Sequence, residues 1–190
     1  MKEHKFERTD LDGLDRRPAV IALDKPIVVE ADETVAARLE QFGINAPRAS
    51  VLPRNFAVAN SPEDFVYEQM TSTIRILGRQ VGLEITVAGP SGHHTIHERD
   101  HEIIIPVMQF AHAFLIEGGA TITVSFFEHL ARHLESRCGR REAREYEAAF
   151  ELVVTRGRMA KRLTYRGPVQ GLPSIVEAAR TAFGANSDDC

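Results

Sequence analysis

The alternation of apolar and polar positions predicts a strand–helix–strand unit in the first half of the chain. An apolar run at residues 56–59 reads as the first strand. Ser61 and Pro62 follow it and are typical of a helix start, because serine caps free backbone N–H groups and proline needs no donor there. Apolar residues then recur at spacings of three and four, as on one buried helix face: Phe65, Val66, Met70, Ile74, Leu77 and Val81. Residues 83–87 alternate like a second strand, which we expect to lie parallel to the first.

Three further elements stand out from their boundaries. Residues 31–42 predict a helix, because acids begin the segment and Gly43 suits the turn that ends it. Residues 149–166 predict an antiparallel hairpin closed through Gly157. Apolar spacing over residues 172–183 predicts a closing helix.

The most apolar stretch runs from 103 to 127, where Glu117 is the only charged residue in 25 positions. That length would allow a bilayer crossing. Its proline, glycines and hydrogen-bonding side chains would make insertion costly, so membrane association is not expected. We expect instead two buried helices within residues 102–136 that turn at Gly118 and Gly119.

These elements predict an α+β fold. The expected core is a small mixed sheet that contains the strand–helix–strand unit of residues 56–87 and the hairpin of residues 149–166. The apolar helix pair of residues 102–136 would cover this sheet.

The length of 190 residues suits a single domain, which we place at residues 18–184. Residues 1–17 alternate acid and base and read as a disordered, solvated tail, while residues 185–190 read as a frayed C-terminus.

Composition narrows the function classes. The formal net charge of -4 gives no general attraction to DNA or anionic lipid. Arginines between residues 137 and 166 make the C-terminal third basic, but few aromatic residues lie among them, so RNA binding is not expected either. Two cysteines cannot build a disulfide framework, which favours a reducing cytoplasm.

Seven of the eight histidines lie between residues 93 and 133. Two of them, His97 and His101, together with Glu98 satisfy the pattern H-E-x-x-H. In this pattern two histidines on a helix bind zinc and the glutamate acts as general base. A catalytic zinc needs a third protein ligand, and the candidates are Glu128, His129 and His133.

The context of this motif weakens it. Arg99 and Asp100 fill its two variable positions, where a helix packed in a protein interior more often carries small or apolar residues. A pattern with three fixed letters also arises readily in a segment rich in histidine and glutamate. Ser91 fails the nucleophile pattern G-x-S-x-G because His93 stands at the final glycine, and Cys138 beside arginines is typical of a surface cysteine.

The sequence therefore favours a non-enzymatic cytoplasmic adaptor or regulatory subunit that acts through protein–protein binding or self-association. The first turn of the strand–helix–strand unit lacks the glycines of a phosphate-binding loop or a dinucleotide fingerprint. The alternative is a metal-dependent hydrolase in which His97, His101 and a third ligand hold zinc and Glu98 is the base. No other cofactor is expected.

Overall fold

The computed structural model describes residues 27–44, 48–89, 94–96, 105–138 and 147–183. These residues form eight strands and several helices. Six of the strands form one mixed sheet of order β1-β8-β7-β6-β2-β4. A separate two-stranded sheet pairs β3 with β5. This architecture confirms the predicted α+β class with a mixed sheet. The elements are β1 (Ile27–Ala31), α1 (Glu33–Gln41), β2 (Ala49–Val51), η1 (Pro62–Asp64), β3 (Val66–Glu68), α2 (Thr71–Gln80), β4 (Ile85–Val87), β5 (His94–Ile96), β6 (Met108–Ala111), α3 (His112–Phe114), the π-helical turn η2 (Leu115–Gly119), α4 (Ala120–Cys138), β7 (Glu147–Arg156), β8 (Met159–Pro168), η4 (Val169–Ser174) and α5 (Ile175–Thr181).

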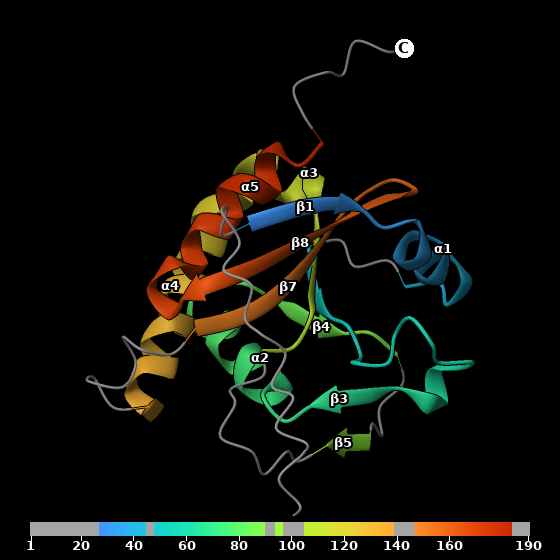
Figure 1. Cartoon of the computed structure of the whole chain (residues 1–190), viewed down its shortest axis with the longest axis horizontal. Coiled ribbons are helices and arrows are strands. Elements are labelled where there is room, and N and C mark those ends of the chain that lie inside the picture. Colours follow the sequence, from blue (N-terminus) through green and yellow to red (C-terminus); the bar gives the residue numbers. More distant parts are fainter. Residues whose placement is uncertain (1–26, 45–47, 90–93, 97–104, 139–146, 184–190) are drawn as a thin grey trace, which may run out of the picture.

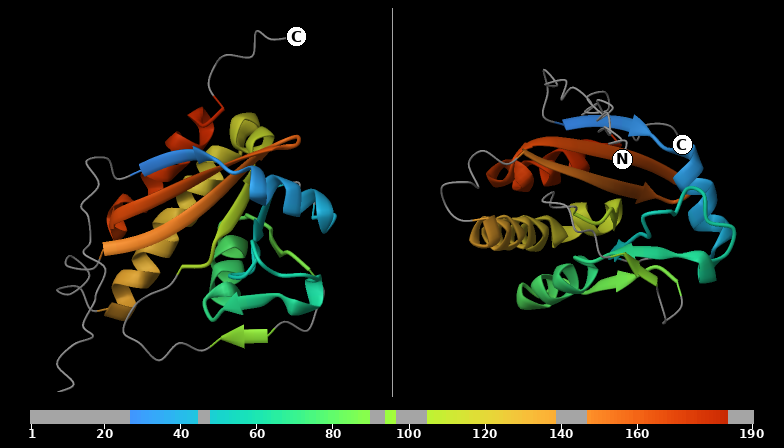
Figure 2. Two further views of the ribbon diagram at one scale, coloured as in Figure 1. Left: turned by 45° about the vertical axis from the view of Figure 1, so that its right-hand side comes forward. Right: turned by 60° about the horizontal axis from the view of Figure 1, so that its bottom comes forward.

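Helices lie on both faces of the large sheet, but unequally. Helices α4 and α5 lie on one side of the strands β7 and β8, and α1 lies on the other (Figures 1 and 2). Helix α2 packs on β4 so closely that a Cβ atom at Gly78 would lie 2.6 Å from Ile85 Cδ1. On the α4 side one row of side chains runs across all six strands, and we call it the helix-face row: Val87, Val51, Met108, Leu152, Leu163 and Val29.

Three sequence predictions are confirmed by the structure. The hairpin is β7 and β8, closed at Gly157 with a φ of 58°. Helix α1 begins after Asp32, whose Oδ1 accepts a hydrogen bond from Val35 N, and Gly43 follows its end with a φ of 62°. The closing helix is α5, preceded by the 3-10 segment η4.

The prediction of a strand at residues 56–59 was wrong. The strand–helix–strand unit exists, but its first strand is β2, which pairs in parallel with β4. Phe56 lies in a loop and is buried between the rings of Phe42 and Phe65, at centroid distances of 5.9 and 6.0 Å. An apolar run can fill a core from a loop, and periodicity over four residues does not separate the two cases.

The helix start predicted at Ser61 and Pro62 was also placed too early. The cap does form, since Asp64 Oδ2 lies 3.1 Å from the Ser61 backbone N, but it begins only the short turn η1. Asn55 then fixes an extended chain by accepting from Val66 N and donating to Asp64 O. Strand β3 follows there, and α2 begins at Thr71.

The expected helix pair over residues 102–136 is corrected in its first half. Residues 108–111 form β6, a strand in the middle of the sheet, and helical structure begins only at His112. A strand buried on both faces reads as a continuous apolar run, which resembles a buried helix in sequence. Gly118 marks the predicted break with a φ of 108°, but the chain continues directly into α4.

Three phenylalanines of this stretch, Phe110, Phe126 and Phe127, lie in the core. Phe127 of α4 lies 6.4 Å from Phe110, 5.1 Å from Phe126 and 5.4 Å from Phe150, measured between ring centroids. In the described part of the chain, no helix combines the length and apolar character needed to cross a bilayer. The predicted tail of residues 1–17 and the C-terminus at 185–190 lie outside the described residues.

Candidate functional site

The face of the sheet that carries α1 is polar at its centre. A second row of side chains crosses the same six strands, displaced by one residue along each strand from the helix-face row. We call it the α1-face row: Thr86, Ser50, Gln109, Val153, Arg162 and Glu30. Thr155 lies two residues beyond Val153 on β7 and so shares this face. Polar side chains therefore occupy central positions on β2, β6 and β7.

Gln109 links these side chains into a hydrogen-bonded chain. Ser50 Oγ donates to Gln109 Oε1 over 2.7 Å, and Gln109 Nε2 donates to Thr155 Oγ1 over 2.8 Å. Thr155 Oγ1 in turn donates to the Phe110 carbonyl, 3.4 Å away. Gln109 is only 2 % exposed and Ser50 1 % exposed. Burying polar side chains costs free energy unless they are hydrogen-bonded. These hydrogen bonds offset that cost, although apolar side chains at the same positions would be cheaper to bury.

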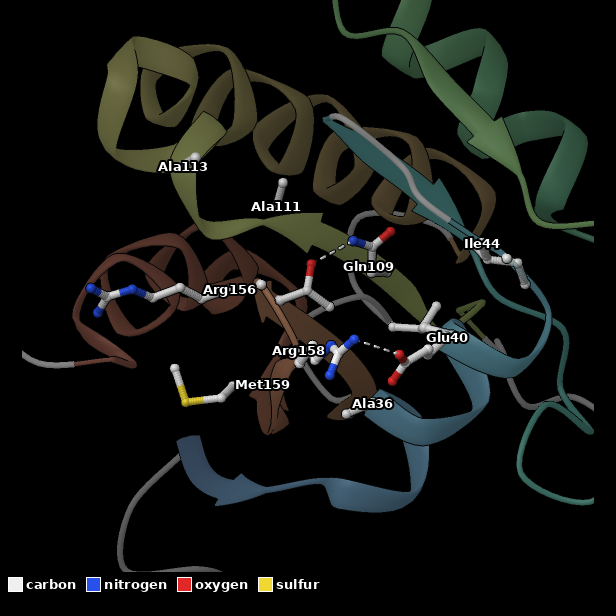
Figure 3. A pocket seen from close by; sticks show the side chains of 13 residues that line it. Ala36, Glu40, Ile44, Gln109, Ala111, Ala113, Arg156, Arg158 and Met159 are labelled. Carbon is white, nitrogen blue, oxygen red and sulfur yellow. Dashed lines mark hydrogen bonds and ion pairs between the residues drawn. The ribbon is translucent and has the colours of Figure 1, made fainter.

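A hollow of about 550 Å³ lies beside this chain, between α1, the end of β6 and the β7–β8 turn (Figure 3). Gln109 and Thr155 are polar residues of its lining, and Leu39 and Ile44 are apolar ones. Small side chains leave the space open, and those that line it are Ala36, Gly43, Ala111, Ala113 and Gly157.

A second hollow, of about 320 Å³, extends along the α1 face towards β4. Gly43 and Ile44 line both hollows, while Ser50 and Thr86 line only the second. The polar row thus reaches both spaces, with Gln109 at one and Ser50 at the other.

An exposed ion pair stands at the mouth of the larger hollow. Arg158 Nη2 lies 3.2 Å from Glu40 Oε1, and their side chains are 87 % and 62 % exposed. An exposed pair of this kind contributes at most about 1 kcal/mol, so it does not hold the mouth shut. Figure 3 shows this pair beside Gln109, whereas the side chains of Arg156 and Met159 point away from it.

Helix α1 is fixed to the sheet beside the hollow. Asp32, which caps the helix, accepts a hydrogen bond from Arg162 Nε over 2.7 Å through its other oxygen, and Arg162 also pairs with Glu151. Burial lowers the pKa of Arg162, but hydrogen bonds and charges from Asp32 and Glu151 outweigh it, so the pKa lies above its ordinary value. The guanidinium stays charged, and the wall formed by α1 keeps its position.

The chemistry of the hollow suits binding better than acid–base catalysis. The Ser50 hydroxyl donates to a carboxamide, which is not a base and does not activate it as a nucleophile. The carboxylate of Glu40 at the mouth is paired with Arg158. Amide and hydroxyl groups held in fixed directions are what orients a bound ligand.

None of the predicted metal ligands that the structure describes lines this hollow. His97, Glu98 and His101 lie outside the described residues, so their zinc site stays a prediction. Glu128, His129 and His133 lie on α4, on the opposite face of the sheet. Among the residues that the structure describes, no three His, Cys, Asp or Glu side chains are grouped as a metal site.

The two histidines of α4 differ in their bonds. His129 Nδ1 lies 2.8 Å from the Ser125 carbonyl and 3.0 Å from Arg132 Nη2, and one ring nitrogen cannot donate to the first and accept from the second. Donation to the carbonyl, the usual helix contact, leaves Nε2 with the free lone pair. His133 Nε2 is buried and has no hydrogen-bond partner in the part of the chain that the structure describes.

Basic residues of the C-terminal third are partly used inside the fold. Arg162 binds Asp32 and Glu151, and Lys161 Nζ donates to the Ala182 carbonyl over 2.6 Å. They are therefore not part of a free basic face.

No protein-family model, curated protein or solved structure matches this chain. Function must therefore be argued from the site itself. The polar chain at Ser50, Gln109 and Thr155 was not among the predicted site residues. One signal in the sequence pointed to it: Gln109 interrupts the most apolar stretch of the chain.

Proposed function

We propose that this protein is a non-catalytic regulatory binding protein and that the hollow beside α1 is its ligand site. The ligand is a small molecule with an apolar body and a neutral, amide-like head group. The protein acts through a partner rather than through a reaction of its own, in keeping with the adaptor or regulatory subunit expected from the sequence.

The buried carboxamide of Gln109 is the observation that carries this proposal. A carboxamide offers two N–H donors and two acceptor lone pairs. Thr155 takes one donor and Ser50 occupies one lone pair, which leaves one donor and one acceptor. A ligand amide presents the complementary acceptor and donor side by side, so it would complete the hydrogen bonding of this group.

The size and lining of the hollow support a small molecule. Its volume of about 550 Å³ falls within the range of about 300–1,000 Å³ that is common for ligand sites. The walls are mostly apolar with a few polar groups, Glu40 at the mouth is paired with Arg158, and the third charged side chain, Arg156, points away from Gln109 (Figure 3). This balance favours a neutral head group over an anionic one.

Benzamide and benzoate form a matched pair of probes for this site. In protein NMR titrations we expect benzamide to shift the amide signals of Gln109, Ala111 and Thr155, and benzoate to shift them much less. Fragments this small bind weakly, with a Kd on the order of 1 mM. Equal shifts with both probes, or none with either, would count against the proposal.

Helix α1 offers a matched pair of variants. Ala36 lines the hollow, whereas its neighbour Ala37 is exposed and does not. Ala36→Phe should fill the space and abolish the benzamide response, and Ala37→Phe should leave it intact. If both variants bind benzamide alike, the hollow is not the site.

The zinc hydrolase remains the second candidate. His129 favours it in one respect: donation from Nδ1 to a backbone carbonyl leaves Nε2 as the coordinating nitrogen, as in many metal-bound histidines. Metal analysis of untagged protein tests it directly. About one equivalent of zinc, lost in His101→Ala with the fold intact, would support the hydrolase, and a metal-free protein that takes up no zinc would eliminate it.

A further inference from the structure

Strand β4 (Ile85–Val87) lies at one edge of the large sheet. Strand β4 ends the strand order and pairs only with β2 among the described residues. Ala88 N donates to the Val51 carbonyl over 3.1 Å, so Ala88 faces β2. Because alternate residues of a strand point their backbone groups to opposite sides, the N–H and C=O of Ile85 and Val87 point away from β2. Free backbone groups of this kind pair readily with another extended chain.

A hollow of about 470 Å³ runs beside this edge, and two arginines of α2 line it. Arg75 and Arg79 are exposed and stand one helical turn apart on the same side of the helix. In the described residues neither guanidinium forms an ion pair. Glu84 is the one acidic residue in the lining, so two positive charges face one negative charge.

The spacing of the arginines matches that of an added strand. Four residues of helix rise about 6 Å. Two residues of an extended strand span about 7 Å, and their side chains point to the same face. A segment lying along β4 with acidic residues at every second position would therefore place one carboxylate near each arginine.

We propose that the β4 edge binds an extended acidic segment of a partner protein, with carboxylates two residues apart. The segment adds a strand next to β4 through the backbone groups of Ile85 and Val87, and its acids pair with Arg75 and Arg79. Strand addition supplies affinity through the main chain, and the arginines supply selectivity. A second copy of this chain paired edge to edge through β4 would bring two arginine pairs together, so charge disfavours that occupant.

Peptide titrations by fluorescence anisotropy test this surface. The probe is a fluorescein-labelled heptapeptide of sequence TVEVEVT, with the glutamine version TVQVQVT and the adjacent-acid version TVEEVVT as comparisons. We expect TVEVEVT to bind about tenfold more tightly than either comparison, since two charge pairs are lost or misplaced in them. Equal affinity for all three peptides, or no binding, would overturn the proposal.

Protein variants separate the charge from the backbone contribution. Arg75→Gln with Arg79→Gln should weaken TVEVEVT about tenfold. Arg132→Gln with Arg137→Gln on α4 carries the same charge change and should leave the affinity unchanged. Val87→Pro removes an N–H that forms no hydrogen bond among the described residues, so a folded variant should lose the peptide. Equal weakening in both arginine pairs, or full binding by folded Val87→Pro, would contradict strand addition at β4.

Two other occupants are distinguished in the same assay. An oligouridylate RNA that binds with the same dependence on Arg75 and Arg79 would show a general polyanion site and overturn the proposal. Light scattering that shows a dimer lost in the Arg75 and Arg79 variant would overturn it in favour of self-association. The edge is independent of the hollow beside α1: Ala36→Phe should leave peptide binding unchanged, so either proposal can fail without the other.

Discussion

The two rows that cross the large sheet are displaced by one residue along every strand, yet they differ in polarity and in how they are covered. The helix-face row is entirely apolar, and its central members Val51, Met108, Leu152 and Leu163 are buried, whereas Val29 at the β1 edge is 42 % exposed. The α1-face row has Thr86, Ser50 and Gln109 on the neighbouring strands β4, β2 and β6. A short helix covers only part of that face and leaves two hollows. The comparison teaches that one face of the sheet is packed against helices, whereas the other keeps polar side chains and open space.

The largest expected effect comes from opening the helix face. Phe127 is fully buried among Phe110, Phe126 and Phe150, so Phe127→Ala should lower the free energy of unfolding by about 3–5 kcal/mol in urea denaturation. Ile116 lies just before α4 and is 56 % exposed. Ile116→Ala is the matched control and should cost about 0.5 kcal/mol or less. Similar losses in both variants would show that the helix face is not the main source of stability.

Making the α1-face row apolar tests the other side of the comparison. Gln109→Leu leaves the Ser50 hydroxyl without its partner and leaves Thr155 only its 3.4 Å contact with the Phe110 carbonyl, and we expect a loss of about 1–3 kcal/mol. Adding Ser50→Ala and Thr155→Val should recover most of that stability, because an apolar set leaves no orphaned groups. The triple variant should still fail to bind benzamide. A triple variant that is stable and binds benzamide as well as the original chain would refute the role given to Gln109.

The two faces of the sheet also differ in how much of each could be predicted from the sequence. The hairpin, α1 and α5 were predicted because glycines and caps act locally, as at Gly43 and Gly157. Strand β6 was missed because burial on both faces removes the alternation that marks a strand. The hydrogen-bonded set in the α1-face row could not be assembled from sequence, since Ser50, Gln109 and Thr155 are distant along the chain and only strand register brings them together. The histidine motif, by contrast, is visible in sequence and lies outside the described residues.

A smaller effect is expected on the helix face at high pH. Burial raises the pKa of Tyr165 above its ordinary value of 10.0, and its hydroxyl donates to the Pro168 carbonyl over 2.6 Å. The unfolded chain therefore loses this proton first as pH rises, so the contribution of Tyr165 to stability is fully present below about pH 10 and is lost as the pH rises further. Tyr165→Phe should be less stable at neutral pH but should lose less stability between pH 9 and 11, as measured by urea denaturation. An unchanged slope in the variant would mean that other groups set the alkaline limit.

The smallest effect on stability is expected at the mouth of the hollow, where the comparison is sharpest. Glu40→Gln breaks an exposed ion pair with Arg158, and we expect a change of about 0.5 kcal/mol or less in the free energy of unfolding. Ligand choice should change more than stability does, because the variant leaves Arg158 without its counter-charge beside Gln109. Benzoate, which the original chain should bind weakly, should then shift the amide signal of Gln109 more strongly, and this response should fall as salt is added. The same substitution at Glu177, which pairs with Arg180 on α5, should leave both probes unaffected. On a face used for binding, a substitution at the mouth can change ligand selectivity without lowering stability, whereas on a packed face it cannot. A large loss of stability in Glu40→Gln would therefore remove the distinction between the two rows.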